Sequence, residues 1–193
     1  SLTLAEGMTG MMENVVISVK NKSKTLTAEV DVPQGGGNGT IVAQGGRFGG
    51  WSLYVKDGVP AYDYNFLGMS RSTVAASKPL APGKSTIRFD FAYDGGGPGK
   101  GGVGTIFVNG EQVAQGRIER TQAMMFSADE TADVGIDLGT PVVEAIGSES
   151  RSRFTGRIPK LTVEVRDGRP DDSSPVFHVL VPAAEWWADI GYT

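Results

Sequence analysis

The run from Thr86 to Asp94 constrains the fold of this chain more than any other segment, because apolar and polar side chains alternate along it. Its large apolar members are Ile87, Phe89, Phe91 and Tyr93, and between them stand Arg88, Asp90, Ala92 and Asp94. Successive side chains of a β-strand point to opposite faces, so this period of two predicts a strand with one buried, aromatic face. A sheet of such strands must pack that face against a second layer.

Two tight turns extend the β prediction. Asp57-Gly58 and Asn109-Gly110 each tolerate the positive φ angles that a two-residue hairpin requires. The flanking strands are predicted over Leu53 to Lys56 and Tyr62 to Phe66 for the first hairpin, and over Thr105 to Val108 and Gln112 to Gly116 for the second. Further strands are predicted over Val15 to Lys20, Thr25 to Val32, Thr40 to Gln44, Ile118 to Arg120, Ala132 to Ile136 and Phe154 to Val165.

Glycine supports the same fold class. It accounts for 28 of the 193 residues, without a collagen-like period, and it separates the short β-rich runs as turn residues do. About a dozen short strands must close or stack to bury their apolar faces. We therefore predict an all-β, antiparallel jelly-roll β-sandwich over residues 1–166. Residues 167–193 are predicted to be a polar linker and an apolar tail, in which Trp186 and Trp187 could anchor self-association.

Composition excludes several kinds of chemistry and of partner. The absence of cysteine rules out disulfides, thiolate metal sites and a cysteine nucleophile. The net charge of −4 is spread without long runs, which argues against nucleic acid and membrane as partners. The chain has neither a membrane-length apolar stretch nor the regions of a signal peptide, so we expect it to be soluble, in an unassigned compartment. Its start at Ser1 favours a fragment of a longer protein.

No motif in the sequence predicts a catalytic centre. Gly97, Gly99 and Gly102 form a G-x-G-x-x-G pattern, but a predicted strand follows, whereas a phosphate-binding turn needs the start of a helix. His178 is the only histidine, and it lies in the tail, far from any G-x-S-x-G elbow. We therefore expect no catalytic residue in this chain.

The carboxylates of Asp129, Glu130, Asp133 and Asp137 form the most informative chemical cluster. Close carboxylates repel one another unless a cation, a basic partner or hydrogen bonds offset their charge. The cluster has three interpretations. Turn capping and pairing with nearby arginines is favoured, a calcium site is the second, and a glycosidase carboxylate pair is the weakest because the compact E-x-D-x-x-E pattern is missing.

A second group combines aromatic and polar side chains on neighbouring predicted strands: Arg47, Phe48, Trp51, Tyr54, Tyr62, Tyr64 and Asn65. Such a group could stack on a sugar or contact a partner protein. Strand alternation sends part of it inwards, so an interpretation as core and rim is favoured. The candidate ligand or interface residues are Arg47, Trp51, Tyr54, Tyr64 and Asn65, together with Trp186 and Trp187 of the tail.

Several extended segments are familiar when they are taken together and in order: Gly39 to Tyr54, Tyr64 to Gly68, Phe91 to Gly102, Phe126 to Val142, and Arg153-Phe-Thr-Gly156. They closely resemble the C-terminal domain of a group of large bacterial arylsulfatases, over the span from Glu6 to Val165. The resemblance implies a concanavalin A-like jelly-roll β-sandwich. In that family a preceding α/β domain carries a formylglycine, within a C/S-x-P-x-R motif, beside a calcium ion. Ser77-Lys-Pro79 and Ser173-Ser-Pro175 both lack the arginine, so no catalytic residue carries over.

The resemblance implies a non-catalytic accessory domain whose partner is the sulfatase catalytic domain of the same parent chain. Such a domain would shape access to the active site and would require no cofactor of its own. The alternative is a free-standing carbohydrate- or ligand-binding module that uses the aromatic group around Trp51 and Tyr64.

Overall fold

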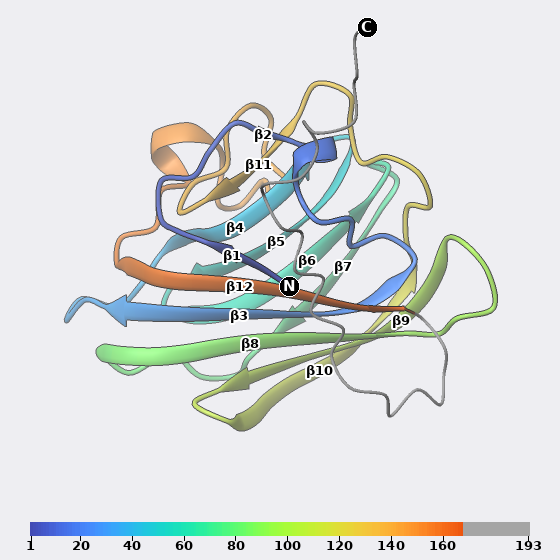
Figure 1. Cartoon of the computed structure of the whole chain (residues 1–193). Coiled ribbons are helices and arrows are strands. Elements are labelled where there is room, and N and C mark those ends of the chain that lie inside the picture. The colour runs from blue at the N-terminus through green and yellow to red at the C-terminus, as the bar shows by residue number, and fades with distance from the viewer. Residues whose placement is uncertain (168–193) are drawn as a thin grey trace, which may run out of the picture.

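The computed structural model describes residues 1–167, which form two antiparallel six-stranded sheets packed face to face (Figure 1). Sheet A has the order β1-β12-β3-β8-β9-β10 and sheet B the order β2-β11-β4-β5-β6-β7. The strands are β1 (Leu2–Leu4), β2 (Met11–Met12), β3 (Lys22–Val32), β4 (Gly39–Gly46), β5 (Gly49–Lys56), β6 (Val59–Phe66), β7 (Ser70–Ala75), β8 (Gly83–Tyr93), β9 (Lys100–Val108), β10 (Glu111–Arg120), β11 (Thr131–Val134) and β12 (Arg157–Asp167). The predicted all-β, jelly-roll β-sandwich is confirmed.

Both predicted hairpins are confirmed. Asp57 and Gly58 join β5 to β6 with φ angles of 51° and 80°, and Asn109 and Gly110 join β9 to β10 with 51° and 87°. Two consecutive positive φ angles define the turn whose twist matches that of the flanking strands. The alternating run at Thr86 lies within β8, where Phe89 is fully buried.

Other boundaries differ from the predictions. Val15 to Lys20 was predicted as a strand, but a short 3-10 helix, η1 (Glu13–Val15), ends there and the chain after it does not pair with a sheet. The predicted strand at Ala132 is shorter than expected and ends at Val134, and the closing strand begins at Arg157. A second 3-10 helix, η2 (Glu149–Arg151), precedes it. Sequence patterns missed β1, β2 and β7, which lie near or at the sheet edges.

The main core lies between the sheets and contains a stack of aromatic rings. The rings of Tyr62 in sheet B and Phe89 in sheet A lie 3.7 Å apart, centroid to centroid, at 9°. Glycines in β9 make room for this stack: a Cβ at Gly104 would lie 2.8 Å from Phe89 Cε2, and one at Gly102 would lie 2.6 Å from Phe91 Cε2. The glycine-rich strand thus allows the large rings of β8 to lie across its neighbour.

A second, smaller core lies on the outer face of sheet B. Val142, Val143 and Ile146, from the long connection between β11 and β12, pack against the outward-facing side chains of the sheet, namely Ala43, Tyr54 and Ala61. As a result β4, β5 and β6 are buried on both faces along almost their whole length. This connection therefore covers the outer face of sheet B over β4, β5 and β6.

No helix within residues 1–167 is long and apolar enough to cross a membrane. The predicted boundary after residue 166 falls one residue before the end of β12. The predictions for Trp186, Trp187 and the rest of the tail lie outside the described residues.

Candidate ligand-binding site

The predicted aromatic group lies mostly in the interior. Trp51 is 2% exposed, Tyr64 3%, Tyr54 6% and Asn65 0%. Trp51 and Tyr64 point into the main core, where Trp51 Nε1 donates to Gln44 Oε1 at 3.0 Å and Tyr64 Oη accepts from the amide of Gln122 at 2.7 Å. This burial agrees with the interpretation as core, and it leaves Arg47 as the one candidate of the five with a substantially exposed side chain.

Lys24 is the unexpected member of this interior. It lies on β3, is 4% exposed, and its Nζ lies 4.7 Å from the centroid of the Trp51 ring and within 6.0 Å of the Tyr62, Tyr64 and Phe91 rings. Burial lowers the pKa of Lys24 to about 7, and the charge of Lys20 adds to this effect. The electron-rich ring faces favour the charged form of the amine, so they oppose the lowering of its pKa by burial. Alternation with Leu26 and Ala28 places Lys24 on the inward face of β3, but the strand predicted from the sequence began at Thr25 and left this lysine out.

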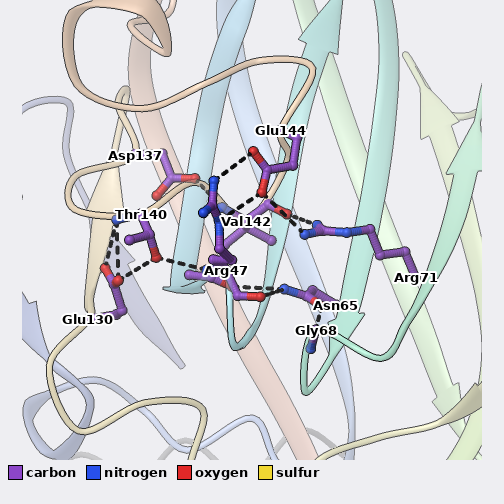
Figure 2. A network of polar contacts seen from close by, with 10 residues as sticks. Arg47, Asn65, Gly68, Arg71, Glu130, Asp137, Thr140, Val142 and Glu144 are labelled. Carbon is purple, nitrogen blue, oxygen red and sulfur yellow. Dashed lines mark hydrogen bonds and ion pairs between the residues drawn. The ribbon is translucent and has the colours of Figure 1, made fainter.

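Arg47 belongs to a polar network that holds the β11–β12 connection over sheet B (Figure 2). Its Nε donates to Glu144 Oε1 at 3.0 Å, and Glu144 also pairs with Arg71, whose Nη1 donates to the carbonyl of Val142. Asn65 Nδ2 donates to the carbonyl of Arg47 at 2.8 Å. These contacts link the β4–β5 turn, β6 and β7 to the β11–β12 connection and help to hold it in place.

The predicted acidic cluster is divided among several loop contacts. Glu130 accepts from the hydroxyl of Thr140 at 2.5 Å, and Asp133 accepts from the amides of Gly10 and Leu138 at 2.7 and 3.2 Å. Asp137 Oδ2 accepts from the amide of Val142 at 3.0 Å, and burial raises the pKa of Asp137 to about 7.

These contacts correspond to the turn-capping part of the favoured interpretation, whereas no ion pair within residues 1–167 joins the cluster to an arginine. Asp129 is exposed, and its amide donates to Ser127 Oγ at 3.2 Å. Residues 1–167 contain no group of three carboxylate or histidine side chains that could hold a metal ion. Hydrogen bonds hold the carboxylates of Glu130 and Asp133 and one oxygen of Asp137, whereas Asp137 Oδ1 is buried without a partner. The calcium site stays a prediction.

A cleft of 710 Å³ lies between the start of β9, the end of β10, the β6–β7 turn and the loop after β10. Its size lies within the range of small-ligand sites. Apolar side chains with high exposure line it: Met124 at 87%, Met125 at 55% and Leu67 at 47%. Exposed methionines make adaptable contact surfaces, since their side chains are flexible and polarisable.

The rim of this cleft is ordered by hydrogen bonds from side chains. Tyr93 Oη donates to the carbonyl of Gly97 at 2.6 Å and accepts from the amide of Lys100 at 2.9 Å. Asn21 Oδ1 accepts from the amide of Gly99 at 2.8 Å, and Asn21 Nδ2 donates to the carbonyl of Ala123 at 2.8 Å. The glycine-rich loop that resembled a phosphate-binding turn therefore forms one wall of the cleft.

The charged residues of the cleft are unevenly paired. Arg117 forms two hydrogen bonds with the carboxylate of Asp94, at 2.8 and 2.5 Å, and lies 3.7 Å from Glu119. The hydrogen bonds from Arg117 hold the pKa of Asp94 below its usual range. Arg120 instead lies over the ring of Phe66, 5.3 Å from its centroid. Sequence patterns missed this site because its residues come from four separate segments.

The fold defines the chain as an antiparallel jelly-roll β-sandwich domain. No protein-family model matches its sequence, and the search of curated proteins found no match. Among solved structures, it is similar to the CBM40 of the Ruminococcus gnavus IT-sialidase, with a TM-score of 0.52 and 14% identity, covering 75% of this chain and 76% of that one.

Two further solved structures share the fold. Domains LG4-5 of the mouse laminin alpha1 chain give a TM-score of 0.52 at 15% identity, over 91% of this chain and 42% of that one. The receptor binding domain of botulinum neurotoxin type G gives 0.50 at 10% identity, over 74% of this chain and 34% of that one. The chain thus spans less than half the length of these two. At such identities the likeness shows the fold alone.

Proposed function

We propose that this domain is a non-catalytic binding module that takes its ligand in the cleft between Leu67, Met124, Met125 and the start of β9. The observation that carries the proposal is the combination of this cleft's volume with its exposed apolar walls. Folding normally hides such side chains, and a contiguous exposed group of them marks a binding surface.

The architecture supports a binding role. The CBM40 of the same sialidase has also been solved bound to α2,3-sialyllactose, with a TM-score of 0.50 and 15% identity to this chain. The similar toxin domain is named as a receptor binding domain. Fold analogy does not by itself establish function, so the proposal rests on the cleft and uses these similarities only as support.

The location of the cleft suits a binding module. The outer face of sheet B is covered by the β11–β12 connection, and the core between the sheets is filled by the Tyr62 and Phe89 stack. The cleft instead lies among loops and strand ends that come from both sheets. Binding residues are often found on loops that a rigid scaffold positions.

The test is the binding of the full chain to an immobilised panel of neutral and acidic polysaccharides, compared between two matched variants. Leu67→Asp places a charge in the apolar wall and is expected to abolish binding. Val15→Asp makes the same kind of change at an exposed residue that does not line the cleft, and it is expected to leave binding unchanged. Binding that survives both Leu67→Asp and Met125→Asp would show that the ligand does not bind in this cleft. Retention on no member of the panel would count against the function.

A second candidate is the accessory domain of an arylsulfatase, and the segment-level resemblance from Glu6 to Val165 favours it. The exposed side chains of Phe48, Met69 and Met124 are of the kind that a neighbouring domain covers when it packs against this one. Two measurements test this candidate. The reading frame before Ser1 should encode a C/S-x-P-x-R motif, and the chain alone should show no aryl-sulfate hydrolysis that survives repurification.

A further inference from the structure

Lys100 and Arg120 lie directly opposite each other on the β9–β10 ladder. Residues paired in this way project to the same face of the sheet, with their Cβ atoms about 5 Å apart. Both side chains are exposed. Two like charges in this position repel each other and weaken the strand pair, which proteins normally avoid unless something else is gained.

Nothing within residues 1–167 neutralises this pair. The two acidic residues that line the same cleft, Asp94 and Glu119, are both directed to Arg117. Neither Lys100 nor Arg120 forms an ion pair in this part of the chain. The cleft therefore carries two positive charges that no carboxylate within residues 1–167 pairs with, beside its apolar wall.

Strand alternation and the ring of Phe66 together define where the guanidinium of Arg120 lies. Ile118, two residues earlier, is 1% exposed and points into the main core, so strand alternation places Arg120 on that same inward face, at the mouth between the sheets. The ring of Phe66, from the opposite sheet, lies under its guanidinium at 5.3 Å. Stacking of this kind restricts the guanidinium before a ligand arrives and leaves its N–H groups free to bind.

We infer that Lys100 and Arg120 form an anion-binding subsite of this cleft, and that its ligand is a sugar bearing a sulfate or carboxylate group. This inference rests on the proposed function and specifies its ligand. Arginine presents N–H donors in a planar fork that matches the oxygens of such groups, and lysine adds a point charge. A bound anion would also remove the repulsion between the two side chains.

A sugar is favoured over other anions because the charged pair stands beside apolar walls. Met124, Met125 and Leu67 offer surfaces against which the C–H groups of a sugar ring can pack. A nucleic-acid site would need a wider basic surface, whereas the chain has a net charge of −4. One anionic group and one apolar ring face match the composition of the cleft.

The experiment measures affinity of the full chain for paired probes that differ only in charge: dextran sulfate against dextran, and polygalacturonate against its methyl ester. Binding to one or both anionic probes and not to their neutral partners is expected, with an affinity that falls as salt is added. Lys100→Gln and Arg120→Gln should each weaken binding about tenfold, because each removes one charge-assisted contact. Lys160→Gln, an exposed lysine on β12 outside the cleft, should have no effect.

The two proposals fail in different ways. Equal binding of charged and neutral probes, lost in Leu67→Asp, would overturn the anionic ligand and leave the binding module standing. Unchanged affinity in the Lys100→Gln, Arg120→Gln double variant would overturn the assignment of this subsite. Equally effective competition by a single-stranded oligonucleotide would overturn the choice of a sugar as the ligand. Binding to none of the four probes would overturn the sugar ligand altogether. Lys100→Gln and Arg120→Gln should each melt at or slightly above the temperature of the parent chain, because each relieves the like-charge repulsion.

Discussion

Lys24 Nζ lies 4.7 Å from the centroid of the Trp51 ring, inside the main core of the sandwich. Lys24 forms no ion pair with a carboxylate within residues 1–167. Three more aromatic rings, of Tyr62, Tyr64 and Phe91, lie within 6.0 Å of the same nitrogen. An amine in this position is costly to keep charged, and aromatic faces compensate only part of that cost.

The first prediction is that the stability of the domain depends on pH through Lys24. The unfolded chain holds this proton up to a pKa of 10.5, and the folded chain only up to about 7. Between these values the unfolded state binds more protons, so the free energy of unfolding rises with pH and is lowest below about 7. Lys24→Met should remove this slope and stabilise the domain near neutral pH by on the order of 3–5 kcal/mol.

Denaturant unfolding between about pH 7 and about pH 9 measures this effect. The matched control is Lys160→Met, at an exposed lysine, which should leave the slope of the parent chain intact. A slope that persists unchanged in Lys24→Met would show that the folded pKa of this lysine is close to its ordinary value.

The second prediction concerns the glycines of β9. A Cβ at Gly104 would lie 2.8 Å from Phe89 Cε2, and the Phe89 ring cannot move away because it is stacked on Tyr62 at 3.7 Å. Gly104→Ala should therefore cost about 1–3 kcal/mol, as overpacking of a core does. Gly35→Ala, where a Cβ meets nothing within 4 Å, should change stability by less than about 0.5 kcal/mol. Thermal or denaturant unfolding compares the two, and equal effects would refute the packing explanation.

The sequence predicts the strands whose pattern is local. The alternation around Phe89 and the Asp57-Gly58 and Asn109-Gly110 turns correspond to β8 and to both hairpins. The edge strand β7 was missed, because its alternation is weak and it owes its order to pairing with β6. β4 and β5 are covered on their second face by a connection that follows them by many residues, and no local pattern encodes that contact.

The third prediction tests how the β11–β12 connection is held. Arg71 donates to the carbonyl of Val142 and pairs with Glu144, so Arg71→Met leaves that carbonyl unpaired above the small core. Hydrogen exchange of the amides near Ile146 should become faster, because the free energy of local opening should fall by about 1–3 kcal/mol. Lys56→Met removes an exposed ion pair at the β5–β6 turn and should leave these amides unchanged. Unchanged exchange in Arg71→Met would show that apolar packing alone holds the connection.

The fourth prediction separates the two main interpretations of the acidic cluster. Glu130 and Asp133 accept hydrogen bonds from Thr140, Gly10 and Leu138. Because these contacts need no ion, the melting temperature should be the same with excess calcium and with a chelator. Glu130→Gln should then be tolerated, with a loss of about 1 kcal/mol from a weaker bond to Thr140. A clear rise in melting temperature on adding calcium, lost in Glu130→Gln, would instead establish the calcium site.

The candidate site was less predictable than the fold. Trp51 and Tyr64 attracted a binding interpretation because aromatic residues stack on sugars, yet their place in the alternation of β5 and β6 turns them inwards. The residues that line the cleft, such as Lys100 and Met124, lie in segments that carry no motif. Only the register of β9 against β10, which places Lys100 opposite Arg120, reveals the pair. A site assembled from paired strands needs that register, and a single sequence does not supply it.

The fifth prediction connects the rim of the cleft to binding. Tyr93 Oη donates to the carbonyl of Gly97 and accepts from the amide of Lys100, so this one hydroxyl ties the middle of the glycine-rich loop to the first residue of β9. Tyr93→Phe keeps the ring, which packs beside Phe91. It removes both hydrogen bonds, which should lower the free energy of unfolding by about 1–3 kcal/mol. The backbone at Lys100 should then exchange faster, and affinity for an anionic probe should fall although both charged side chains are still present. Hydrogen exchange and binding measured on the same sample check this link. Faster exchange with undiminished affinity would mean that the loop wall does not position Lys100 for its ligand.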